Sequence, residues 1–321
     1  MNDYTIPEIH HPIDHMVASS ERVAGLREQV IGLIPRWPTD EHTLSLLRRM
    51  SMNDLLSTYV NWVDRLIPPR KRRAMVWDGF YARNDPARFA AEINEIVVAI
   101  EDGRDLYPYL SSRVRTHGFV PRPSKRKGIN WGDKDMALNG HDVHHLHLVP
   151  ANDNGKRSGS SKELLYVGVS REEILLLMLG DHKSFDDGTL ITAVSEHRAQ
   201  AGHTLKGIVG LSREVSPKEA SELTRHGITS PQMVGSQVAV PTTILTAGTS
   251  PSHTMHVDRC CETIEKLEPH LHDRAVLART LSVAPGCLPV DPKWVWQFWY
   301  ADLCLTDERS STVFCVRPWQ R

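Results

Sequence analysis

The sequence lacks the features that would assign it to a membrane-spanning, secreted or disulfide-rich class. No stretch approaches the roughly 18 consecutive apolar residues of a transmembrane helix, and the start MNDYTIPEIHHPIDH has neither the basic nor the apolar region of a signal peptide. The five cysteines lie in the last quarter of the chain and form no CxxC pair, so neither a disulfide framework nor a zinc knuckle is indicated. We therefore expect a cytoplasmic protein without a membrane partner.

An excess of charge and the common nucleophile motifs are also missing. Lys and Arg number 38 against 39 Asp and Glu, so the net charge of -1 predicts no partner by itself. The sequence has no GxSxG elbow and no P-loop pattern of glycine and lysine. Arg198 and His203 have the Rx4H spacing of HEPN-type ribonucleases, but Gly202 argues against one continuous helix through both. Any chemistry must come from local clusters.

Length and periodicity indicate an α+β protein with several compact parts. A chain of 321 residues is too long for one ordinary small domain. Capping residues and apolar spacing predict helices over 19–33, from 41, 52–66, 86–103, 190–199, 216–225 and 256–267. We expect a helical N-terminal part (1–83), a central antiparallel sheet with packed helices (84–200) and a smaller C-terminal α+β domain (201–321).

Strand patterns concentrate in the middle and at the end of the chain. Residues 142–149 alternate as a half-buried strand does, and the apolar runs 164–169 and 174–179 flank the turn SREE, which predicts a buried hairpin. We also predict a strand over 205–211. A last apolar hairpin is expected over 294–305 and 311–316, with its aromatic side chains in the core of a small sheet.

Four histidines fall within seven positions, at 141, 144, 145 and 147. Successive side chains of a strand point to opposite faces, so His145 and His147 should share one face while His144 lies on the other among apolar neighbours. His144 therefore favours a structural role over a catalytic one. Two imidazoles on one face can bind a metal, hold a phosphate or act as acid and base.

A second polar cluster follows the predicted hairpin directly, at Gly180-Asp181-His182-Lys183. Consecutive strands tend to pair. If the second strand of the hairpin lies beside the histidine strand in the sheet, His182 and Lys183 stand at the rim of the surface that carries His145 and His147.

Basic residues cluster in three places around the histidine region, and Trp131 near one of them could stack on an unpaired base. Phosphate contacts supply most of the affinity for nonspecific nucleic acid. The candidate nucleic-acid-binding residues are Arg70, Arg72, Arg73, Lys125, Arg126, Lys127, Trp131, Lys156 and Arg157. Each cluster could equally be a solvated loop.

The order amphipathic helix, strand, LLYVGVSREEILLLMLGDHKSF resembles the core of RelE/ParE-like (BECR-fold) toxins, over about residues 84–190. That family comprises small ribonucleases and gyrase poisons with helices packed on an antiparallel sheet. The resemblance implies metal-independent cleavage of RNA by histidine and basic side chains. The candidate catalytic residues are His145, His147, His182, Lys183, His144 and Tyr166.

Three functions follow from these patterns. The leading one is an RNA-cleaving toxin or phage-defence effector without a cofactor. In its mechanism His145 and His147 exchange protons and Lys183 stabilises the phosphate. Its partners would be RNA and an antitoxin or regulatory protein. The second is a zinc hydrolase with the HxH pair completed by His182, His141 or Asp181. The third is a non-enzymatic nucleic-acid-binding module.

Overall fold

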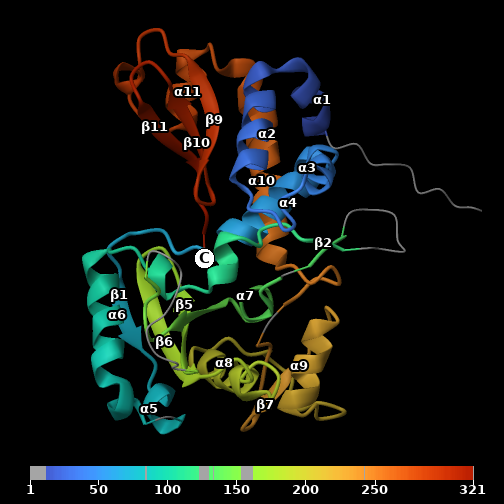
Figure 1. The fold of residues 1–321 in the computed structure, drawn as a ribbon, viewed down its shortest axis with the longest axis vertical. Coiled ribbons are helices and arrows are strands. Elements are labelled where there is room, and N and C mark those ends of the chain that lie inside the picture. The colour runs from blue at the N-terminus through green and yellow to red at the C-terminus, as the bar shows by residue number, and fades with distance from the viewer. Residues whose placement is uncertain are drawn as a thin grey trace, which may run out of the picture. The chain divides into compact units, whose positions relative to one another are not determined.

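The structure is a computed structural model that describes residues 12–83, 85–122, 130–132, 134–152, 162–241 and 243–320. Helices and strands form a mixed α+β arrangement (Figure 1), which confirms the predicted fold class. Within the described ranges, no helix is both long and apolar enough to cross a bilayer.

The chain divides into two compact units, each assembled from separated segments. The first unit takes residues 1–63, 117–132 and 253–319, and the second takes 64–116, 133–252 and the last two residues. The predicted boundaries after residues 83 and 200 both fall inside the second unit. The three predicted domains therefore do not coincide with the two units, because a compact unit is defined by packing between segments and not by their order.

The second unit is built on a four-stranded sheet of order β1-β6-β5-β4. Its strands are β1 (Arg73–Val76), β4 (Val143–His147), β5 (Leu164–Val169) and β6 (Glu173–Gly180). The antiparallel pairing of β4, β5 and β6 confirms the predicted hairpin and the predicted histidine strand. The edge strand β1 runs parallel to β6, so the sheet is mixed and not purely antiparallel as predicted. The strand β1 has only four residues and begins at Arg73, the last residue of a basic run, so the sequence did not predict it.

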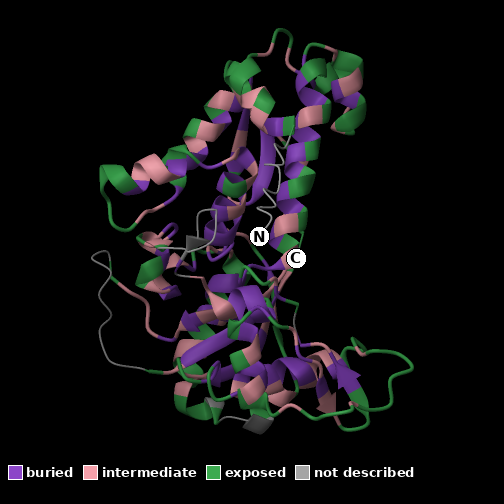
Figure 2. Ribbon diagram, turned by 90° about the vertical axis from the view of Figure 1, so that its right-hand side faces the viewer, coloured by how far each residue is buried: buried purple, intermediate pink, exposed green. Residues whose placement is uncertain are grey.

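A helix covers each face of this sheet, because strand side chains alternate between its faces. On one face Leu146, Leu165 and Leu176 pack against α6 (Ala90–Asp102). On the other face Tyr166, Leu177 and their neighbours pack against α8 (Thr189–Gln200). The strands are mostly buried (Figure 2), which explains why β5 and β6 read as continuous apolar runs.

Local capping signals fix the starts of the helices as predicted. Asp85 accepts a hydrogen bond from the N–H of Ala87 at the start of η1 (Pro86–Phe89), which leads into α6, and Gly103 closes α6 with φ of 74°. Ser216 likewise accepts the N–H of Glu219 in α9 (Pro217–Arg225). A side-chain oxygen at the N-cap satisfies one of the first helical N–H groups, which the helix itself leaves unbonded.

The second unit also contains short elements that connect these parts. They are α5 (Gly79–Arg83), η2 (Tyr107–Tyr109), η3 (Ser112–Arg115), α7 (Met136–His141), β7 (Gln232–Val234) and β8 (Gln237–Ala239). The prediction of a strand over 205–211 is wrong. The segment forms a turn, where Gly207 has φ of 81°, and exposed loop in which Val209 is 93% exposed. An apolar run interrupted by two glycines thus stays outside the sheet.

The first unit combines helices with a three-stranded antiparallel sheet of order β11-β10-β9. Its helices are α1 (Pro12–Ser19), α2 (Glu21–Leu33), α3 (Glu41–Arg48), α4 (Met52–Val63), α10 (Pro251–Leu267), η4 (Glu268–His270), α11 (Arg274–Thr280) and η5 (Pro285–Cys287). Its strands are β2 (Pro121–Arg122), β3 (Asn130–Trp131), β9 (Trp294–Trp299), β10 (Asp302–Asp307) and β11 (Thr312–Arg317). Trp294, Trp296 and Phe298 are buried, which confirms the predicted aromatic core for these three residues. Trp299 is exposed and Tyr300 is half-buried, so the prediction is wrong for them.

Candidate active site

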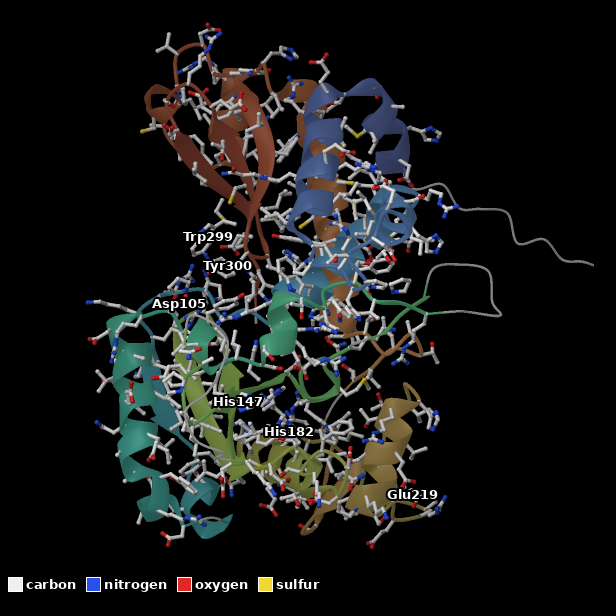
Figure 3. All side chains as sticks on the ribbon, in the orientation of Figure 1. Asp105, His147, His182, Glu219, Trp299 and Tyr300 are labelled. Carbon is white, nitrogen blue, oxygen red and sulfur yellow. The ribbon has the colours of Figure 1, made fainter. Side chains whose placement is uncertain are left out.

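The structure brings three histidines from two elements together on the α8 face of the central sheet. His147 lies opposite Leu164, and Leu164 lies opposite Gly180, so the turn after β6 stands beside the end of β4. The ring of His182 is centred 6.2 Å from that of His145 and 5.7 Å from that of His147. Figure 3 labels His147 and His182 in the second unit. The prediction that the second strand of the hairpin lies beside the histidine strand is wrong, because β5 lies between β6 and β4. The side chain of His182 nevertheless lies near those of His145 and His147.

His145 and His182 line a cavity of about 520 Å³. Tyr166 and Phe185 also contribute to its wall. The charged side chains around it are Arg65, Arg113, Lys134, Asp135, Asp186 and Arg225. Cations therefore outnumber carboxylates in the described wall, and the cavity is suited to a ligand with negative charge. Sequence reasoning missed these four cations, because they come from four separate segments and none lies in a basic run.

Asp135 holds a carboxylate beside His145. One of its oxygens, Oδ1, accepts the N–H of Leu138 at 3.1 Å and caps the start of α7. The other, Oδ2, lies 3.7 Å from Nδ1 of His145. A helix cap thus fixes the position of an acidic group that can orient the imidazole.

The turn that carries His182 is held by three hydrogen bonds around Asp181. The Tyr166 hydroxyl donates to the carbonyl of Asp181 at 2.8 Å, and the Asp181 N–H donates to Oγ of Ser184 at 3.0 Å. The Lys183 N–H donates to Oδ1 of Asp181 at 2.7 Å. The position of His182 is therefore set by the local backbone and by β5.

Burial lowers the pKa of His182 below its ordinary value, and the nearby charge of His145 lowers it further, while Asp181 opposes the change. The neutral imidazole is therefore favoured near neutral pH, and a neutral imidazole can accept a proton.

Two predicted catalytic residues have other roles at this site. Tyr166 is buried, burial raises its pKa, and its hydroxyl donates to the Asp181 carbonyl, so it positions the turn that carries His182. Lys183 is exposed on the same turn and does not line the cavity.

The predicted catalytic role of His144 does not fit its position. Its side chain is buried on the opposite face of the sheet from His145, as the strand alternation predicted. Its Nε2 lies 2.7 Å from the carbonyl oxygen of Asp64. His144 is therefore a structural residue that fixes the chain before β1.

The predicted basic cluster at residues 70–73 does not flank the histidines. Arg72 is buried, and its guanidinium donates to the carbonyls of Ser170 at 2.9 Å and Pro68 at 2.8 Å. Burial lowers its pKa to about 10, helped by the charges of Arg70 and Arg171. Arg73 pairs with Glu173 at the start of β6, whereas His182 follows the end of that strand. An eight-residue strand places them roughly 25 Å apart.

The other predicted nucleic-acid-binding side chains cannot be placed. Lys125, Arg126, Lys127, Lys156 and Arg157 lie outside the described residues, and of Trp131 only the backbone in β3 is described. The cationic wall of the cavity thus replaces the sequence-predicted clusters as the candidate phosphate-binding surface.

The zinc alternative would use His145, His147 and His182. In the part of the chain that the structure describes, no three His, Cys, Asp or Glu side chains are arranged to hold a metal ion. Treatment of the protein with a chelator therefore tests whether this site binds a metal ion.

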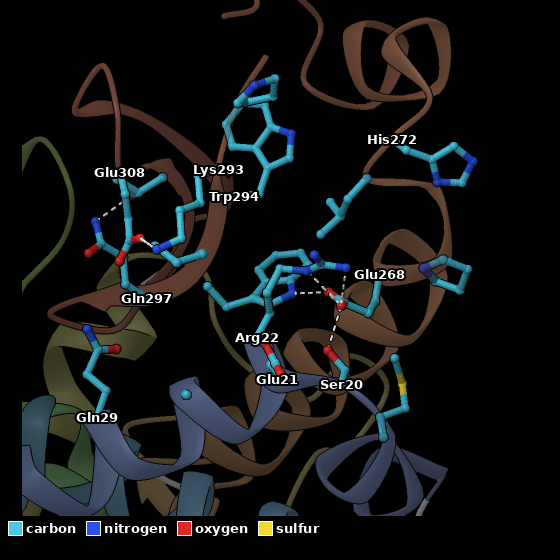
Figure 4. A pocket seen from close by; sticks show the side chains of 18 of the residues that line it. Ser20, Glu21, Arg22, Gln29, Glu268, His272, Lys293, Trp294, Gln297 and Glu308 are labelled. Carbon is cyan, nitrogen blue, oxygen red and sulfur yellow. Dashed lines mark hydrogen bonds and ion pairs between the residues drawn. The ribbon is translucent and has the colours of Figure 1, made fainter.

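A second cavity, of about 1220 Å³, lies within the first unit (Figure 4). The buried carboxylate of Glu268 accepts hydrogen bonds there from the Ser20 hydroxyl at 2.6 Å, Nε of Arg22 at 2.8 Å and Nε1 of Trp296 at 2.7 Å. These bonds connect the start of α2, η4 and β9. The described side chains of this wall carry more carboxylates than cations (Glu21, Glu265, Glu268, Glu308, Arg22, Lys293). It is therefore less suited to a phosphate than the smaller histidine-lined cavity.

Comparisons of the chain with protein-family models, with curated proteins and with solved structures found no match. The resemblance to RelE/ParE-like toxins therefore stays a prediction. The geometry of the histidine site is therefore the basis for inferring a function.

Proposed function

We propose that the chain cleaves RNA without a metal ion, in the cavity lined by His145 and His182. The proposal rests on two imidazoles from different elements that line the same cavity. The described wall of that cavity has four cations and two carboxylates. Imidazoles supply both an acid and a base near neutral pH, and fixed cations stabilise the charge of a phosphate. A volume of about 520 Å³ lies in the range of small-molecule sites.

His182 acts as the base in this mechanism, because its lowered pKa favours the neutral ring. It takes the proton of a ribose 2′-hydroxyl while the 2′-oxygen attacks the phosphorus. The bond from phosphorus to the 5′-oxygen breaks, and His145, oriented by Asp135, gives that oxygen its proton. The products are a 2′,3′-cyclic phosphate and a 5′-hydroxyl end. This pair replaces the predicted exchange between His145 and His147, since His145 and His182 share the cavity.

The four cations of the cavity wall differ in burial and in the contacts that hold them. Arg65 is buried, so its charge lies in a partly desolvated part of the wall, whereas Arg113 on η3 is exposed to solvent. Arg225 pairs with Asp186 and lies over the Phe185 ring, and Lys134 donates to the carbonyl of Ala247. These contacts hold the cations in place before the substrate arrives, and preorganised charge contributes most to stabilising a transition state.

The decisive experiment uses a labelled single-stranded RNA and its counterpart with one 2′-deoxy nucleotide. The wild-type protein should cleave the RNA in EDTA and leave a 2′,3′-cyclic phosphate, and the deoxy position should resist cleavage. His145→Ala and His182→Ala should each lose about 10²- to 10⁴-fold in rate. His270→Ala, an exposed histidine of the first unit, is the matched control and should be unchanged.

Other outcomes separate the alternatives. Cleavage that EDTA abolishes and zinc restores would favour the zinc hydrolase. RNA binding without cleavage, unaffected by either alanine variant, would favour the binding module. A toxin or phage-defence role further predicts that expression arrests growth in wild type and not in His145→Ala, and that an antitoxin partner relieves the arrest.

A further inference from the structure

A third cavity, of about 770 Å³, lies on the same face of the central sheet as the proposed active site. Val143, Gly168 and Leu175 form its apolar floor across β4, β5 and β6. Its polar edge comes from His141 at the end of α7, from His197 and Arg198 near the end of α8, and from His203 beyond it. An apolar pocket with a few convergent polar groups is the usual form of a small-molecule site.

His141 is the unexplained group in this cavity. It directly precedes the predicted strand 142–149, ends α7 and is 1% exposed. Neither of its ring nitrogens has a hydrogen-bond partner among the described residues. Burial and the charge of Arg198 lower its pKa to about 3, so the ring is neutral and offers one donor and one acceptor. Buried polar groups without partners are rare in proteins.

The charged side chains in the described wall of this cavity are one cation, Arg198, and two carboxylates, Asp142 and Glu173. Arg198 donates to the carbonyl of Val240 at 3.0 Å and lies 3.4 Å from Oδ2 of Asp142. Burial, together with the charges of Arg198 and His203, lowers the pKa of His197. The edge is therefore rich in hydrogen-bonding groups but poor in free positive charge, which favours an uncharged ring over a phosphate or a carboxylate. The Rx4H motif of HEPN-type enzymes is not formed, because α8 ends at Gln200 before His203.

The cavity lies near the proposed active site, although the two cavities share no described lining residue. Val143 precedes His145 by two residues on the same face of β4, a distance of roughly 7 Å along the strand. The ring of His141 is centred 5.5 Å from the ring of Phe185, which lines the catalytic cavity.

We propose that this cavity is a nucleobase subsite, in which the base next to the scissile phosphate lies on the strand floor and pairs with His141. The proposal rests on the proposed RNA cleavage for its place beside a scissile phosphate. Flat rings with adjacent donors and acceptors are what unpaired bases offer to proteins. Gly168 leaves the floor open, since a Cβ added there would meet only the Leu175 side chain, at 3.8 Å.

Two variants test the subsite by different means. His141→Leu removes the donor and acceptor, whereas Gly168→Val fills the floor and leaves every polar group in place. Valine is compatible with a strand. The matched control is Gly210→Val, because an added Cβ there meets nothing within 4 Å. Titration calorimetry with adenosine, guanosine, cytidine, uridine and inorganic phosphate measures binding without turnover.

At least one nucleoside should bind the wild type, and both variants should weaken that binding by about 10-fold or more, the effect of one or two hydrogen bonds or of lost space. Gly210→Val should match the wild type, and phosphate binding should not change in any variant. Cleavage should occur next to the base that binds best, and this preference should vanish in Gly168→Val.

A failure of the nucleobase-subsite proposal can be distinguished from a failure of the proposed RNA cleavage. No nucleoside binding, or binding that Gly168→Val leaves unchanged, overturns the subsite even where RNA is cleaved. Nucleoside binding that both variants remove, in a protein that does not cleave RNA, supports the base site and overturns the proposed reaction. Preferential binding of benzoate over all nucleosides would also overturn the assignment to a base.

Discussion

Replacing His141 with leucine should stabilise the second unit, although it removes a group that we assign to ligand binding. The wild-type ring is 1% exposed and has two nitrogens without partners in the described residues. A buried polar group without a partner costs about 1–3 kcal/mol. Leucine has a similar size and keeps the apolar contact with Phe185. We therefore expect the free energy of unfolding to rise by about 1–3 kcal/mol near pH 7.5.

The stability that His141→Leu gains over the wild type should increase as the pH falls. The folded pKa of His141 is lowered to about 3 from an ordinary 6.5. Between these values the unfolded chain binds a proton that the folded chain does not, so the wild type loses about 1.4 kcal/mol per pH unit as the pH falls below 6.5. At pH 4.5 this amounts to about 2.7 kcal/mol, which the leucine variant does not lose. The advantage of His141→Leu should then reach about 4–6 kcal/mol.

Amide hydrogen exchange of β5 and β6 is the suitable assay, because it reports on the second unit alone and the intrinsic pH dependence cancels between wild type and variant at each pH. His144→Leu is the contrasting buried control. It removes the partner of the Asp64 carbonyl and should destabilise the unit by about 1–3 kcal/mol. If His141→Leu is no more stable than the wild type at pH 7.5 and shows the same loss in acid, the account of a neutral, unpartnered imidazole is wrong.

Three further predictions follow from the same structure. Glu268→Ala should destabilise the first unit by about 3–5 kcal/mol, since the hydroxyl of Ser20 and the indole of Trp296 lose a buried charged partner. Denaturant unfolding followed by tryptophan fluorescence should show a lower midpoint for the variant. Arg72→Met should lower stability without weakening RNA binding, because that guanidinium is engaged by main-chain carbonyls; a loss of RNA affinity in gel-shift titrations of the folded variant would contradict this. The acid limb of kcat/KM should lie below pH 6.5, because the pKa of His182 is lowered and a base must be unprotonated to act. A limb above pH 6.5, or one that persists unchanged in His182→Gln, would remove His182 from that role.

Local patterns in the sequence were sufficient for most of the elements. The caps at Asp85 and Ser216, the alternation through β4 and the two apolar runs of β5 and β6 depend on neighbours within a few residues. The separation of His144 from His145 and His147 follows from strand geometry alone. The predicted strand over 205–211 was wrong because its glycines favour a turn. The strand β1 was missed because four residues that begin at the end of a basic run are too few to show an alternating pattern.

The composition of the candidate site was decided only by the tertiary structure. The sequence by itself determined that histidines would line one face of a strand and that His182 would follow a buried strand. It could not show that the cations of the cavity come from Arg65, Arg113, Lys134 and Arg225, since proximity between distant segments depends on packing and not on spacing. Packing likewise turned the basic residue Arg72 inward and left His141 without a described partner. Local geometry is set by local residues, whereas charge and burial at a site depend on everything that packs around it.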